Sequence, residues 1–201
     1  MTIYASGLNN IELFIPAPSN VDIDFIQHGE VFTFPATKPA YFIRDGQRVL
    51  RMSFFFRGYK ELTQIVDFYH RVQGKYKKFW IPSFINEFVL TRDIPPLSSF
   101  CYVKNNNFKA RSKKKERVFI WLKNNDWIIR KVVNVESESE EEERISFDIP
   151  TPNFWIRTGD VFCFGFLLLV RFDTPLQIKA VKDEATATTE LSMVELIHEL
   201  P

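Results

Sequence analysis

Residues 52–83 read MSFFFRGYKELTQIVDFYHRVQGKYKKFWIPS. An apolar run opens this stretch, and a segment with apolar residues at helical spacing follows it. These residues form one apolar stripe on a helix: Leu62, Ile65, Val66, Tyr69 and Val72. Gly74 stands where a C-terminal helix cap usually falls. The stretch therefore predicts a single helix over about residues 60–73, followed by a basic and aromatic span at residues 78–82.

On both sides of this helix the pattern favours strands. Residues 21–25 alternate apolar and acidic side chains, which is typical of a strand with one dry and one wet face. Asp45-Gly46 between two apolar runs is a hairpin signal. The chain also contains 21 Phe against 7 Gly, and aromatic rings fit a pleated, half-buried surface. We expect a mainly β protein with further strands at these ranges: 11–15, 30–34, 86–91, 100–103, 144–149, 161–173, 176–181 and 186–197.

Residues 104–147 differ in character from the rest. Two aromatic runs, 117–123 and 127–135, flank Asn124-Asn125-Asp126 and predict a hairpin. A basic run precedes this hairpin and an acidic run follows it. We therefore predict a β-rich core domain of residues 1–103 and 148–201, with residues 104–147 inserted as a charged hairpin or arm.

The basic segment 109–117 has two interpretations. Cations interleaved with rings hold single-stranded nucleic acid, and Phe108, Phe119 and Trp121 are the nearby rings. The acidic block 136–143 would lie close to the segment and partly cancel its field. We favour a mobile loop of both signs that is solvated or pairs with a neighbouring subunit. Its candidate peripheral contacts are Lys113, Lys114 and Lys115.

Catalytic and metal-binding patterns are not found. His28, His70 and His198 have no ligand spacing, and the scattered glycines supply no phosphate-binding loop. No serine has the context of a nucleophile elbow. Cys101 and Cys163 form neither a disulfide framework nor a metal motif, so we expect them to be reduced, buried and inert. We expect no enzyme activity, no metal and no cofactor.

Charge and hydropathy limit the partners further. The net charge is +1, so no global field attracts nucleic acid or an anionic membrane. The longest apolar run, residues 161–170, is too short to span a bilayer. We see no secretory signal pattern, and we expect synthesis in a cytoplasm and no membrane partner.

Four segments resemble one family. Residues 52–58 run into the helix, and residues 74–83 follow it with glycine, basic residues and Phe79-Trp80-Ile81-Pro82. Residues 170–174 read VRFDT, and Val194-Glu195-Leu196 follows near the end. This order is similar to that of distal-tail and tail-tip proteins of long-tailed bacteriophages and of gene transfer agents. The resemblance covers residues 41–92 and 168–197, whereas residues 104–147 depart from the pattern.

The resemblance implies a β-sandwich or rolled barrel with one flanking helix. It also implies a virion protein of the tail tip, whose copies form a ring, commonly a hexamer. Such a ring joins the tail tube protein to hub or tail-tip proteins and to receptor-binding components. We expect Phe79, Trp80 and Phe84 either to anchor the interface between copies or, slightly favoured, to pack the helix on the sheet. Two other functions stay open: a nucleic-acid-binding β-module that uses residues 109–117, and a cell-wall or carbohydrate-active tail enzyme.

Overall fold

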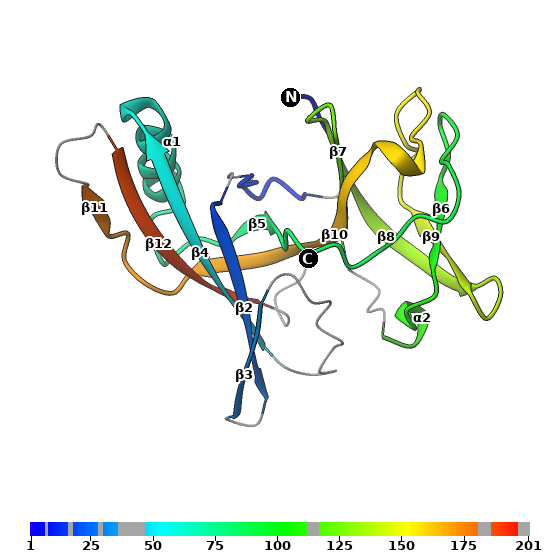
Figure 1. The fold of residues 1–201 in the computed structure, drawn as a ribbon, viewed down its shortest axis with the longest axis horizontal. Coiled ribbons are helices and arrows are strands. Elements are labelled where there is room, and N and C mark those ends of the chain that lie inside the picture. Colours follow the sequence, from blue (N-terminus) through cyan, green and yellow to red (C-terminus); the bar gives the residue numbers. More distant parts are fainter. Residues whose placement is uncertain are drawn as a thin grey trace. The chain divides into compact units, whose positions relative to one another are not determined.

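The structure is a computed structural model, and it describes residues 1–6, 8–15, 18–27, 30–35, 47–111, 117–180 and 186–196. This part of the chain forms twelve strands, mostly antiparallel, with one long helix, one short helix and a 3₁₀ turn (Figure 1). The prediction of a mainly β fold with a flanking helix is confirmed. None of the helices in these ranges is long and apolar enough to cross a membrane.

The chain folds as two compact units. Unit 1 consists of Met1–Asn9 and Pro82–Leu167, and unit 2 of Asn10–Ile81 and Leu168–Glu199. The long strand β10 (Val161–Phe172) begins in unit 1 and ends in unit 2. Each unit is described separately.

Unit 2 is an antiparallel sheet with the strand order β3-β2-β4-β12-β10. Its central pair, β4 with β12, runs from Thr186 opposite Arg57 to Val194 opposite Val49. Helix α1 (Tyr59–Arg71) follows β4 directly and packs against it (Figure 1). Besides β10, the strands of this unit are β2 (Asn20–Gln27), β3 (Glu30–Pro35), β4 (Gln47–Arg57), β5 (Phe79–Pro82), β11 (Ile178–Ala180) and β12 (Thr186–Glu195).

Helix α1 follows the predicted stripe with one addition. Ile65 and Val72 are buried as expected, and so is Phe68, which the predicted stripe left out. The helix ends at Arg71, two residues earlier than predicted. Gln73 donates to the His70 carbonyl and Gly74 to the Tyr69 carbonyl, which is the Schellman pattern. The first left-handed position of this cap is therefore Gln73, with φ 54°, and Gly74 follows it with φ 61°.

Unit 1 is built on the strand order β10-β7-β8-β9-β6, and β1 pairs with β8 in parallel. Strands β7 and β8 form the predicted aromatic hairpin, with Trp121 opposite Trp127 next to the turn. The elements are β1 (Ile3–Ala5), β6 (Phe100–Lys104), α2 (Phe108–Arg111), β7 (Arg117–Leu122), β8 (Trp127–Ser137), β9 (Glu142–Phe147) and η1 (Thr158–Asp160).

The structure divides the chain at other points than the domain prediction did. Residues 104–147 do not form an arm beside a core, because they supply β7, β8 and β9 to the sheet of unit 1. The physical reason is the apolar content of the hairpin: Phe119, Ile120 and Ile128 are almost completely buried. The basic and acidic runs on either side of the hairpin suggested an inserted arm, whereas the apolar strands between them form part of a core.

Two predicted strands are corrected. Residues 11–15 and 86–91 form only isolated bridges, Leu13 with Trp80 and Leu90 with Val103. Conversely, residues 79–82, which were predicted only as a basic and aromatic span, form strand β5. The first half of the predicted Asp45-Gly46 hairpin lies outside the described residues.

Candidate interaction surfaces

Two of the three predicted anchors lie in the core of unit 2. Phe79 and Trp80 are both 0% exposed. The Phe79 ring lies 5.1 Å from that of Phe68 on α1 and 4.7 Å from that of Phe172 on β10. Phe14 stacks on Phe68 at 4.3 Å. Phe79 and Trp80 therefore pack inside the fold, as the favoured interpretation expected, and neither presents a ring to a neighbouring molecule.

The third anchor, Phe84, belongs to unit 1 and is half-buried. It has a φ of 57°, which is uncommon for a bulky residue, and its ring contacts those of Trp121 and Trp127 edge-on. Trp121 stacks on Trp127 at 4.7 Å, and Phe162 covers Trp121 at 4.5 Å. Phe162 is 60% exposed, so it forms the accessible edge of this cluster. Its outward position on the strand was not recognised from the sequence, because it stands in an almost continuous apolar run.

The predicted peripheral contacts Lys113, Lys114 and Lys115 lie outside the described residues, but both flanks of their segment are visible. On the N-terminal flank, the Glu143 carboxylate accepts hydrogen bonds from the Phe108 and Lys109 backbone N–H groups, each at 2.9 Å. Glu143 is only 1% exposed. One member of the predicted acidic block is thus a buried clamp for the first turn of α2, which leads into the basic segment.

On the C-terminal flank, Arg117 begins β7 and is 1% exposed. Burial lowers the pKa of its guanidinium, and nearby Asp148 acts in the opposite direction. Arg117 is therefore a core residue rather than part of an exposed basic patch. The rings proposed for stacking on bases are also engaged: Phe108 and Phe119 are buried, and Trp121 is stacked on Trp127.

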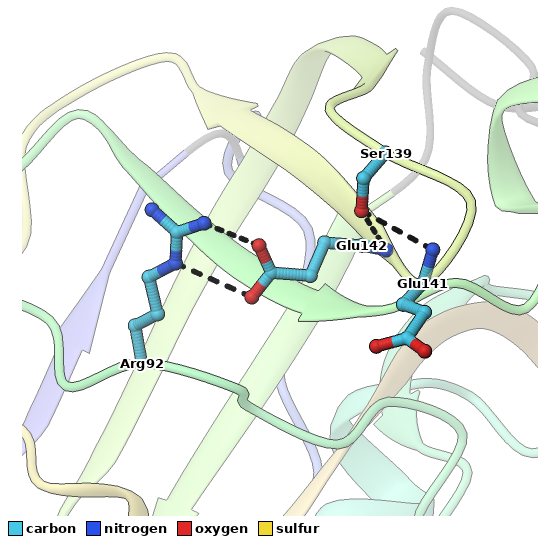
Figure 2. A network of polar contacts seen from close by, with 4 residues as sticks. All are labelled: Arg92, Ser139, Glu141 and Glu142. Carbon is cyan, nitrogen blue, oxygen red and sulfur yellow. Dashed lines mark hydrogen bonds and ion pairs between the residues drawn. The ribbon is translucent and has the colours of Figure 1, made fainter.

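The rest of the acidic block lies around the turn between β8 and β9. Arg92 forms a two-point ion pair with Glu142, and Ser139 Oγ accepts from the Glu141 and Glu142 backbone N–H groups (Figure 2). The hydrogen bond from Arg92 lowers the pKa of Glu142, and a bond from Thr91 adds to this. Arg144 pairs with Glu136 on the same face of the sheet.

Three carboxylates of this turn have no such partner. Glu138, Glu140 and Glu141 are exposed, and none of them forms an ion pair with a described residue. Lys104 lies across the same turn, beside Glu140 and Glu141. We call Glu138, Glu140 and Glu141 the acidic tip.

A surface of opposite charge lies in unit 2, where the chain leaves α1. Among the described residues, four cations and one carboxylate, Glu12, border a hollow of about 540 Å³. Glu12 lies 3.9 Å from the Arg71 guanidinium. The Lys77 backbone N–H donates to the Val72 carbonyl, which holds this lysine beside the helix end. We call the four cations the basic groove: Arg71, Lys77, Lys78 and Arg171.

A larger hollow of about 1040 Å³ lies on unit 2 beside β4, β11 and β12. Its charged lining carries both signs, with Asp22, Asp173 and Glu190 against Arg51 and Lys179. This mixture indicates no ligand of a particular charge.

Both cysteines are free and lie buried in unit 1. Burial raises the pKa of the Cys101 thiol, and burial together with nearby Glu87 raises that of Cys163 to about 12. Both thiols are therefore protonated near neutral pH and poor nucleophiles. Within the described ranges, no three His, Cys, Asp or Glu residues could jointly hold a metal ion. His70 lies exposed on α1, while His28 and His198 lie outside those ranges.

Comparison with known proteins yields no match, neither to a family model nor to a curated protein.

Proposed function

We propose that this chain is a structural, non-enzymatic subunit of a phage tail tip. Its copies form a ring that joins the tail tube to the hub and to receptor-binding components.

The observation that carries this proposal is where the segments of the resemblance lie. Strand β4, helix α1 and strand β5 follow one another in the sequence and the end of β10 comes much later, and all contribute to the core of unit 2. The Phe68, Phe79 and Phe172 rings, one from each of the last three elements, contact one another. The segments that carry the resemblance thus belong to one core, as expected if they mark a shared fold element.

The charge distribution also supports a protein that works through contacts. The net charge is close to zero, yet the acidic tip and the basic groove are separate surfaces of the same chain. A ring needs a head-to-tail contact between two different surfaces of identical subunits. Two complementary surfaces meet that requirement.

The first test is the mass of the purified chain over a wide concentration range, measured by analytical ultracentrifugation, with negative-stain images of the particles. We expect a discrete multimer with a central opening. We also expect co-sedimentation with the tail tube protein encoded in the same genome. A chain that stays monomeric at the highest concentration and does not bind that tube protein contradicts the proposal.

The nucleic-acid alternative is tested on the same preparation. Retention of single-stranded DNA at low salt, lost with Lys113→Glu, Lys114→Glu and Lys115→Glu combined, would favour that alternative. We expect no retention, because the rings near the basic segment are buried or stacked on one another. Activity on peptidoglycan that disappears with a single carboxylate substitution would instead favour the enzyme alternative.

A further inference from the structure

The acidic tip is held in one conformation by contacts that leave its carboxylates outside. The Asn105 backbone N–H donates to the Glu141 carbonyl at 2.7 Å, and the Asn105 side-chain amide donates to the Glu140 carbonyl at 3.0 Å. The Glu138 backbone N–H donates to the Glu142 carbonyl at 3.0 Å. Because the backbone of the turn is tied in this way, little backbone conformational entropy is lost when the turn meets a partner.

The nearest arginines offset the charge of the tip only in part, because each of them interacts with Glu138 but is paired with another glutamate. Arg92 is engaged by Glu142, and it also lies 4.0 Å over the Tyr102 ring. Arg144 is engaged by Glu136. Lys104 is the one described lysine at the turn, and it faces more than one carboxylate. The tip therefore retains an excess of negative charge.

The basic groove has the opposite imbalance. Among the described residues of its lining, Glu12 is the one carboxylate and it pairs with Arg71, while Lys77 and Arg171 also border the hollow; Lys78 lies there too and has further contacts. The charges of the two surfaces are thus opposite, with exposed carboxylates at the turn between β8 and β9 and cations around the groove.

We propose that the acidic tip of one copy docks into the basic groove of a second copy. This inference rests on the proposed self-assembly and names the two surfaces that make the contact. The surfaces differ, so the contact is head-to-tail and each subunit uses both at once, which permits a closed ring. Exposed charges are screened by salt, so assembly weakens by about tenfold or more between about 0.05 M and about 0.5 M salt.

The experiment uses two charge-reversed variants of the full chain. The tip variant carries Glu138→Lys, Glu140→Lys and Glu141→Lys, and the groove variant carries Lys77→Glu and Arg171→Glu. Each variant alone should stay monomeric at concentrations where the unmodified chain forms multimers, because its two surfaces now have like charge. A mixture of both variants should regain multimers in which the two alternate, since each reversed surface then meets its opposite.

The mixture separates loss of the contact from loss of the fold, because misfolded chains would not regain assembly on mixing. Lys60→Glu combined with Lys123→Glu is the matched control: both lysines are exposed and lie outside the tip and the groove. This control should assemble like the unmodified chain. All variants are checked for native circular dichroism.

Variants that assemble as well as the unmodified chain, or a mixture that stays monomeric, overturn the inference and leave the ring proposal standing. An unmodified chain that is monomeric throughout overturns both. A tip that reached the groove of its own copy would leave the mass independent of concentration, which also contradicts the inference.

Discussion

The cores of the two units differ in the side chains that they bury. The core of unit 2 is dominated by aromatic rings, with Phe14, Phe68, Phe79 and Phe172 in mutual contact. Unit 1 buries rings too, but it also buries charged side chains that bind backbone groups: Arg130 and Glu143 are at most 3% exposed. In unit 1 these two side chains bind backbone groups of other segments, such as the Phe108 N–H and the Pro150 carbonyl.

Arg130 shows how a buried charge serves this purpose. Its Nη1 donates to the Tyr4 and Ile129 carbonyls at 2.6 and 2.7 Å, and its Nη2 donates to the Pro150 carbonyl at 2.9 Å. These bonds tie β1 and the segment after β9 to β8. Buried backbone carbonyls without a partner are costly, so one guanidinium stabilises three separate segments. Burial lowers the pKa of this group, and Asp148 acts in the opposite direction.

The largest expected effect is loss of a ring from unit 2. Phe68→Ala removes a buried side chain that contacts Phe14, Phe79 and Phe172, and should lower the free energy of unfolding by about 3–5 kcal/mol. Denaturant unfolding measures the loss, and hydrogen exchange should locate it in α1, β5 and the end of β10. Phe68→Leu, which keeps most of the volume, should cost clearly less. Equal losses for both substitutions would mean that ring packing does not dominate this core.

A smaller loss of stability is expected at Gly165, where the packing of unit 1 leaves no space for a side chain. A Cβ on Gly165 would lie 2.3 Å from the Ile85 carbonyl oxygen and 2.3 Å from Glu87 Oε2. The Glu87 carboxylate also accepts from the Phe166 backbone N–H at 2.7 Å, so it cannot move away freely. Gly165→Ala should therefore destabilise the protein by about 3 kcal/mol in denaturant unfolding.

Gly159→Ala is the matched control, because no atom lies within 4 Å of the added Cβ. It should change the stability by less than about 0.5 kcal/mol. If Gly165→Ala were equally neutral, the packing around β10 would be looser than described.

A still smaller loss of stability is expected when the buried Glu143 carboxylate of unit 1 is removed. Glu143→Ala leaves the Phe108 and Lys109 N–H groups without their acceptor and should cost about 2 kcal/mol. Hydrogen exchange should become faster at these two amides. Glu140→Ala, in the same acidic block but exposed, should leave the stability of the monomer within about 0.5 kcal/mol. Similar results for both would make Glu143 an ordinary surface charge.

The smallest effect concerns the end of α1 in unit 2. Gln73 adopts a φ of 54° without being glycine, so Gln73→Gly should stabilise the protein by up to about 1 kcal/mol. Thermal unfolding followed by circular dichroism measures the change. Gln64→Gly, at an exposed position within the helix, should instead destabilise by about 1 kcal/mol. Destabilisation by both would place the left-handed cap elsewhere.

The elements that the sequence predicted are those whose signal is local. Helix α1 was found from apolar residues three and four apart, and the β7–β8 hairpin from two aromatic runs around Asn124-Asn125-Asp126. Residues 79–82 were not predicted as a strand, because a run that is buried on both faces has no alternation. The domain boundaries were predicted at the charge runs that flank the hairpin. The apolar hairpin between these runs is buried, so residues 104–147 belong to the core of unit 1.

The sequence by itself determined the mainly β fold, the place of the helix and the near-neutral charge, since each depends on composition or on neighbours a few residues apart. Only the tertiary structure decided that Phe79 and Trp80 are core residues, that Phe162 is exposed, and that Glu143 differs from the other glutamates of its run. These properties depend on segments separated by many residues, and no short-range pattern records which of them meet. Burial and hydrogen bonding arise only where distant segments come into contact in the folded chain, so the same type of side chain can be a core residue in one place and a surface residue in another.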